Sequence, residues 1–148
     1  MRLNPDCVRD VLLYIEENLV YLEEENTSKI QAISWGTAFQ DEYLSDKYSI
    51  YDIKYTIQKL YEVHFIECSI ATSGRKGWLS CDITNLTWNG HEFLDTVRGK
   101  TVWEATKEKA LKLGGMSIKT LGVLALEITK AIATHPNLIN DIVNNMSR

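Results

Sequence analysis

The chain has 148 residues, a formal net charge of -4 at pH 7 and a sequence pI near 5.4, with 45% hydrophobic and 24% charged residues. This length suits one hydrophobic core, and the composition excludes an intrinsically disordered chain and a strongly basic nucleic-acid-binding protein. The charge is uneven, because residues 1–50 carry ten acids and four bases, a net of -6, which leaves +2 for the remainder.

Three cysteines, Cys7, Cys68 and Cys81, occur without a CxxC spacing, and the sequence enters a helix start without a signal peptide. We therefore expect a cytoplasmic protein in a reducing compartment. The most apolar stretch, residues 121–133, is interrupted by Glu127 and Lys130. It is also shorter than the roughly 20 residues of a membrane helix, so we expect neither a membrane span nor a membrane partner.

The first predicted element is a helix with Asn4 as its N-cap and Pro5 at the first helical position. Its apolar residues recur at helical spacing, and its charged residues occupy the opposite face. The apolar set is Val8, Leu12, Ile15, Leu19 and Leu22, and the outward set is Arg9, Asp10, Glu16, Glu17 and Glu23. Residues 23–28 end this helix, residues 29–35 have the β-branched character of a short strand, and residues 37–46 form a brief helical turn.

A second long helix is predicted over residues 49–63, with Ser49 and Asp52 as a capping-box-like pair. Its inward stripe is Ile50, Ile53, Ile57 and Leu60, and its outward residues are Tyr51, Lys54, Tyr55, Gln58 and Glu62. His64 follows at the position where glycine is the usual left-handed terminus, so we expect an exit turn that differs from the commonest one.

The hydrophobic period then changes to two, which predicts a β-hairpin with strands at residues 65–71 and 78–84. A symmetric hairpin pairs residue 66 with 83, 68 with 81 and 70 with 79. The tip of the turn carries Arg75 and Lys76. The face expected to be buried consists of Ile66, Cys68, Ile70, Leu79, Cys81 and Ile83, and Glu67, Ser69, Ser80 and Asp82 point outward.

After the hairpin the chain turns directly into a helix, with Thr87 as the expected N-cap and Gly90 allowing close approach to neighbouring backbone. Phe93, Leu94 and Val97 return this helix to the core, and Gly99 ends it. The next helix begins at Thr101 with Glu104. Its apolar members are Val102, Trp103, Ala110 and Leu113, and it stops at Gly114 and Gly115.

The last long helix begins at Ser117 and carries more apolar surface than one packed face hides. Its seam is Ile118, Leu121, Ala125, Ile128 and Ile132, and Val123, Leu124 and Leu126 extend beyond it. Pro136 ends the helix, and residues 137–146 form a short amphipathic tail. Two alternatives are open. One is association with a second copy or a partner through Leu121, Leu124, Leu126, Ile128 and Ile132; the other is coverage by Leu138, Ile139, Ile142 and Val143 of the tail.

The order helix, short strand, helix, hairpin, helix is that of a winged helix, in which the helix before the hairpin is the recognition helix. We therefore expect an α+β, mainly helical fold: a winged-helix-like domain with a β-hairpin wing and additional C-terminal helices. The expected domains are residues 1–113, the winged-helix-like part, and residues 114–148, a helical extension.

Three blocks of sequence also resemble a family of uncharacterised proteins, found mainly in phages and prophages of low-GC Gram-positive bacteria and known as a domain of unknown function. The blocks are "MRLNPDCVRDVLLYIEENL", "IYDIKYTIQKLYEVHFIE" and "ITNLTWNGHEFLDTVRGKTVWEATKEKA". The resemblance implies a winged-helix-like fold, a mobile-element origin and hence the cytosol of a host cell. It supplies no catalytic residues.

The residues carry no recognisable catalytic, metal or cofactor motif. His64, His91 and His135 are scattered without HExxH spacing, and the glycines of the hairpin tip precede no helix that could bind a phosphate. Cys68 and Cys81 are either small core residues or a redox pair, and the helix dipole can lower the pKa of Cys7. We expect structural cysteines, no cofactor and no enzyme.

Two kinds of binding partner, duplex DNA and a protein, remain possible for the outer face of residues 49–63. Duplex DNA would meet Tyr51, Lys54, Tyr55 and Gln58 in a groove and Arg75 and Lys76 at the phosphates, but the acidic N-terminal half opposes it. A protein would use the tyrosines and Trp78, residue types that anchor interfaces. We expect a non-enzymatic interaction protein that binds a protein partner and inhibits a host process or a defence system, such as an anti-CRISPR protein. A winged-helix transcriptional regulator is the alternative.

Overall fold

The computed structural model describes residues 2–24, 27–114 and 117–146. The fold is α+β and mainly helical, with two small antiparallel sheets, as the sequence predicts. The chain forms two compact units, Met1–His91 and Glu92–Arg148. The domain boundary expected after residue 113 stays a prediction.

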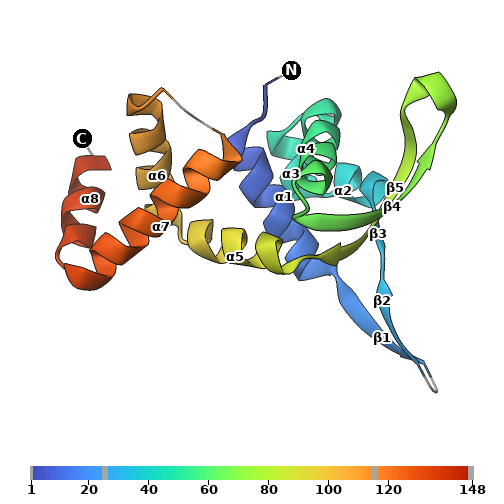
Figure 1. Ribbon diagram of the computed structural model, residues 1–148, viewed down its shortest axis with the longest axis horizontal. Helices are drawn as coiled ribbons and strands as arrows, with labels where there is room; N and C mark the ends of the chain where they lie inside the picture. Colours follow the sequence, from blue (N-terminus) through green and yellow to red (C-terminus); the bar gives the residue numbers. More distant parts are fainter. Residues whose placement is uncertain (1, 25–26, 115–116, 147–148) are drawn as a thin grey trace. The chain divides into compact units, whose positions relative to one another are not determined.

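The elements follow one another along the chain as labelled in Figure 1. The first unit contains α1 (Pro5–Asn18), β1 (Val20–Glu24), β2 (Thr27–Gln31), β3 (Ile33–Ser34), α2 (Trp35–Gln40), α3 (Glu42–Lys47), α4 (Ile50–Glu62), β4 (Ile66–Thr72), a 3-10 turn (Gly74–Lys76) and β5 (Trp78–Leu86). Helix α5 (Trp88–Val97) begins in it, and α6 (Lys100–Lys112), α7 (Ile118–Thr134) and α8 (Leu138–Met146) belong to the second unit.

Helix α1 begins as predicted, because the Asn4 side chain accepts hydrogen bonds from the backbone N–H groups of Asp6 and Cys7. Its buried residues include Val8, Leu12 and Ile15. Two expectations are wrong. Asp10 is only 5% exposed rather than outward, and the helix ends at Asn18, so Leu22 is not helical.

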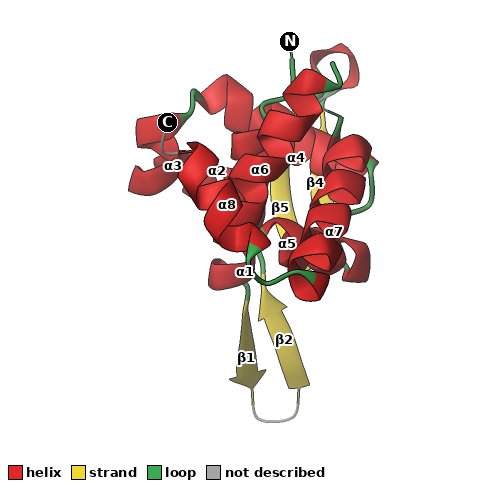
Figure 2. Ribbon diagram, turned by 90° about the vertical axis from the view of Figure 1, so that its left-hand side faces the viewer, coloured by secondary structure: helices red, strands yellow, loops and turns green. Residues whose placement is uncertain are grey.

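The residues that follow α1 form the β1–β2 hairpin, which the sequence analysis missed. Val20 pairs with Gln31, Tyr21 with Ile30 and Leu22 with Lys29. These β-prone residues gain cross-strand partners that a longer helix would deny them. In Figures 1 and 2 the hairpin extends from the end of α1 as a two-stranded ribbon, and β1 and β2 pair only with each other among the described strands.

Helix α4 is capped by the Ser49 hydroxyl, which accepts from the Asp52 N–H. Ile53, Ile57 and Leu60 are buried as predicted, whereas Ile50 is half exposed and Thr56 is the further buried residue of the helix. The exit turn is the common left-handed one, contrary to expectation. His64 adopts φ 57°, its N–H bonds the carbonyl of Tyr61, and the Phe65 N–H bonds that of Leu60. These two bonds are the Schellman arrangement.

The second sheet has the strand order β3-β5-β4, in which both neighbouring pairs are antiparallel. The predicted register is wrong by two or more residues, because Ile66 pairs with Leu86, Cys68 with Ile83 and Ile70 with Cys81. The shift begins at the turn, where Thr72 pairs with Trp78, one residue away from the predicted register. The irregularities after Ala71 and Glu67 each add one further residue on β5. Ile66, Cys81 and Ile83 are buried, Cys68 and Ile70 are partly buried, and Leu79 is 59% exposed at the second irregularity.

The junction between β5 and α5 confirms the roles expected of Thr87 and Gly90. The Thr87 Oγ1 accepts from the Gly90 N–H at 3.1 Å and donates to the carbonyl oxygen of His64 at 2.7 Å. A Cβ on Gly90 would lie 2.3 Å from the carbonyl oxygen of Phe65. The first turn of α5 therefore rests directly on the chain that leaves α4.

The second unit is helical. Helix α6 begins with Gly99 rather than Thr101 as its N-cap, and Trp103, Thr106 and Ala110 are buried while Leu113 is exposed. Gly114 follows with φ 72°, and Gly115 lies outside the described residues. Helix α7 is capped by Ser117 as predicted, and it contacts α6 and α8.

The apolar residues of α7 divide between the interior and the surface. Leu121, Leu124 and Ala125 are buried, and Ile118, Ile128 and Ile132 are partly buried. Val123 and Leu126 are exposed. Helix α8 leaves Ile139 and Val143 exposed while Leu138 and Ile142 are partly buried, so the tail contacts α7 without covering all of it. Within the described ranges, every helix is too short or too polar to cross a membrane.

Candidate interaction surface

The candidate partner-binding residues predicted from sequence lie on three elements of the first unit. Tyr51, Lys54, Tyr55 and Gln58 belong to α4, Trp78 opens β5, and Arg75 and Lys76 belong to the turn between β4 and β5. We call this set the α4 face. Tyr51 is 69% exposed, Arg75 is exposed, and Lys54, Tyr55, Gln58 and Trp78 are partly buried.

Contacts between aromatic rings join α2, α4 and the β4–β5 hairpin. The Trp78 ring lies 5.4 Å from Tyr61 in an edge-on arrangement and 6.1 Å from Trp35, which also contacts Phe39 at 5.6 Å. Ring pairs at these separations are favourable. Sequence reasoning placed Trp35 at the end of a strand and missed this cluster. The Ser34 side chain, which caps the first turn of α2, was the available signal.

The lysines of α4 are engaged within the molecule. Lys54 Nζ lies 4.6 Å from the centre of the Trp35 ring. Lys59 Nζ lies 2.6 Å from a carboxylate oxygen of Glu62 and 5.3 Å from the centre of the Tyr55 ring. The hydrogen bond to Glu62 raises the pKa of Lys59. A DNA phosphate would therefore compete with partners that these lysines already have.

A buried carboxylate fixes the elements that precede α4. Asp10 accepts hydrogen bonds from the Tyr48 hydroxyl at 2.8 Å, the Lys47 ammonium at 3.1 Å and the Tyr43 hydroxyl at 3.3 Å, and it pairs with Arg9. Burial first, and then the bond to Asp10, raise the pKa of Tyr48 well above its usual range. These contacts join α1 to α3, so they position the start of α4.

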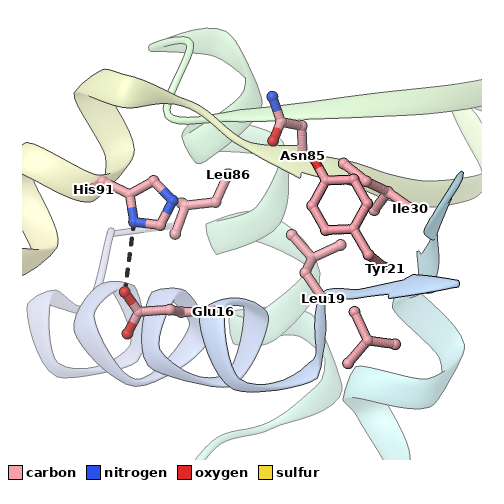
Figure 3. A pocket seen from close by; sticks show the side chains of 8 residues that line it. Glu16, Leu19, Tyr21, Ile30, Asn85, Leu86 and His91 are labelled. Carbon is pink, nitrogen blue, oxygen red and sulfur yellow. Dashed lines mark ion pairs between the residues drawn. The ribbon is translucent and has the colours of Figure 1, made fainter. Parts of the chain in front are cut away.

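A pocket of about 220 Å³ lies at the base of the β1–β2 hairpin (Figure 3). It is lined by Glu16, Leu19, Val20, Tyr21, Ile30, Asn85, Leu86 and His91. At one side of it, Glu16 Oε1 and His91 Nδ1 form an ion pair at 3.5 Å (Figure 3). Sequence reasoning missed this pocket because its walls come from α1, both hairpin strands, β5 and α5. The β-prone pair Val20 and Tyr21 was the local signal.

The sequence profile of the DUF2513 family, described as hypothetical protein, matches residues 2–117. The chain belongs to the DUF2513 family. No curated protein and no solved structure matches it. The match confirms the expected kinship with an uncharacterised family. It includes the whole α4 face and the whole pocket of this DUF2513 chain, whereas α7 and α8 lie beyond it.

The cysteines of this DUF2513 chain lie in the interior or partly so. Cys7 is fully buried, accepts a hydrogen bond from the Thr56 hydroxyl at 3.3 Å, and has its pKa raised to about 11 by burial. The helix dipole therefore does not activate it. Cys68 and Cys81 are diagonal neighbours rather than the expected cross-strand pair, and the nearby Cys81 raises the pKa of the Cys68 thiol. Among the described residues no group of three or more His, Cys, Asp or Glu side chains is placed to hold a metal ion.

Proposed function

We propose that this DUF2513 protein is a non-enzymatic interaction protein that binds a protein partner through the α4 face. The observation that supports the proposal is that the α4 face has an exposed aromatic residue and lysines that already have partners. Tyr51 is 69% exposed on α4, the helix whose Tyr61 packs against Trp78, while the lysines of α4 are engaged by Trp35 and Glu62. Exposed tyrosine and tryptophan are the residue types that anchor protein interfaces.

The scaffold is proposed to be a winged helix in which α4 is the recognition helix and the β4–β5 hairpin is the wing. The order α1, β3, α2 and α3, α4, β4, β5 supports this assignment, as does the sheet order β3-β5-β4, in which the first short strand pairs with the last. The β1–β2 hairpin is then an insertion between the first helix and the first strand of the motif.

The biological setting is proposed from the family resemblance. A phage or prophage protein acting in the host cytosol is suited to inhibit a host process or a defence system, such as CRISPR immunity. This step rests on analogy with the setting of the family rather than on a residue of the site.

Self-association, or a stable complex, is proposed through the second unit. Leu121 and Leu124 are buried in the single chain, so an association surface on α7 uses the exposed Val123 and Leu126, whereas the partly buried Ile128 and Ile132 lie on the other side of the helix. Exposed aliphatic residues grouped on one helix favour such a contact.

Duplex DNA is the competing partner, because the proposed topology is that of many DNA-binding proteins. We expect no saturable binding of mixed-sequence genomic duplexes by fluorescence anisotropy at about 150 mM salt, since few phosphate contacts are open to α4. Tight, sequence-selective binding would favour the regulator. In that case replacing Arg75 and Lys76 by alanine should each lower the salt slope by about one, whereas Lys119→Ala, an exposed base on α7, should not.

A further inference from the structure

The pocket at the base of the β1–β2 hairpin is too small for a whole cofactor or a drug-sized ligand. Its volume of about 220 Å³ is below the roughly 300–1,000 Å³ of pockets for whole cofactors or drug-sized ligands. One long side chain suits this volume. Leu19, Val20, Ile30 and Leu86 supply apolar wall on which a methylene stem can lie.

The pocket offers hydrogen-bond acceptors to an N–H donor. Glu16 contributes a carboxylate, and Asn85 contributes an amide whose Nδ2 donates to Glu67 at 3.3 Å and whose carbonyl oxygen can accept a hydrogen bond. Tyr21 adds a ring and a hydroxyl. An occupant with N–H donors and a positive charge therefore fits better than an anion or a neutral apolar group. It would share the Glu16 carboxylate with His91.

The surroundings have the same charge preference. Residues 1–91 contain 14 acids and 8 bases, a net of -6, and Glu17 and Glu23 are exposed on the two elements that meet at the pocket. The adjoining hairpin presents Val20, Tyr21 and Leu22 to solvent, with Tyr21 71% exposed. An acidic surface with an apolar ridge is complementary to a basic, partly apolar segment.

We propose that this pocket receives an arginine or lysine side chain from a partner protein, with the stem on Leu19 and Leu86 and the charged head at Glu16. The inference rests on the proposed function, since it assigns a chemistry to the protein partner. The β1–β2 hairpin would then be a second docking element. It would bind a basic segment of the partner, while the α4 face contacts aromatic and apolar groups.

The test uses the full 15N-labelled chain and capped single amino acids as probes, so that no partner needs to be known. N-acetyl-arginine methylamide and its lysine counterpart should shift the amide resonances of Glu16, Tyr21, Leu86 and His91 saturably in the millimolar range. The citrulline and norleucine analogues, which lack the charge, should bind at least about fivefold more weakly.

Two neighbouring glutamates give matched variants. Glu16→Gln should weaken arginine binding at least about fivefold, whereas Glu17→Gln, which removes the same charge from an exposed neighbour, should change it less than about twofold. Equal binding of arginine and citrulline, equal effects of the two variants, or no saturable shift up to about 50 mM would each overturn the proposal. The citrulline comparison decides the matter if Glu16→Gln fails to fold. Because no partner is used, failure here leaves binding through the α4 face untouched.

Discussion

Asp10 and Gly90 show how single residues organise the first unit. Asp10 lies on α1, yet its hydrogen-bond donors Tyr43, Lys47 and Tyr48 come from residues more than 30 positions away. The helical periodicity of α1 predicts that this carboxylate faces solvent, because a local spacing pattern contains no information about such distant donors. Gly90 was easier to interpret, since a glycine in the first turn of a helix signals close backbone approach within a short segment.

Gly90→Ala should destabilise the protein by at least about 2 kcal/mol, because the new Cβ would clash with a backbone carbonyl rather than a flexible side chain. The matched control is Gly36→Ala in the first turn of α2, where the new Cβ would lie 3.6 Å from the Ser34 Oγ, an ordinary contact. We expect the control to be neutral or stabilising. Chemical denaturation of both variants checks this, and equal stability would mean that α5 does not rest on Phe65.

Among the helices and strands, the sequence correctly predicted several helix caps, which depend on residues close together in the chain. The caps at Asn4, Ser49, Thr87 and Ser117 form as expected, because each bond joins residues two or three positions apart. The exit turn of α4 at His64 was expected to differ from the commonest left-handed turn, and this expectation is wrong. Its two backbone bonds offset the cost of a non-glycine residue there.

Elements that depend on non-local pairing were predicted less well. The alternation of apolar residues predicted the buried face of β4 and β5 over most of their length, but the turn and two irregularities shift their register, and Leu79 is exposed at one of them. The sequence predicts helix rather than strand for β1, because Leu19 and Leu22 continue the apolar spacing of α1, whereas the short strand expected over residues 29–35 overlaps β2 and β3. Only the pairing of Tyr21 with Ile30 distinguishes the two conformations. The pocket depends on this hairpin and was therefore missed as well.

For the whole molecule, the proposed α4 face and the exposed residues of α7 would provide one surface for a partner and another for self-association. We expect a dimer or larger oligomer by size-exclusion chromatography with light scattering, because Val123 and Leu126 otherwise stay in water. Leu126→Asp should shift the protein toward monomer, whereas Leu111→Asp, at another exposed leucine, should not. A strict monomer at high concentration with a protease-resistant tail would contradict this expectation.

The α4 face is proposed to bind a protein, and crosslinking followed by calorimetry tests this binding. A photo-crosslinking amino acid at position 51 identifies the partner, and calorimetry with the purified partner then gives the affinity. Tyr51→Ala should weaken binding at least about tenfold, as expected of an aromatic anchor, while Trp88→Ala should change it less than about twofold. Trp88 is the matched control, because it is an aromatic residue of the same unit and is 77% exposed. Unchanged affinity of the Tyr51 variant, or an equal loss in both variants, would contradict the claim.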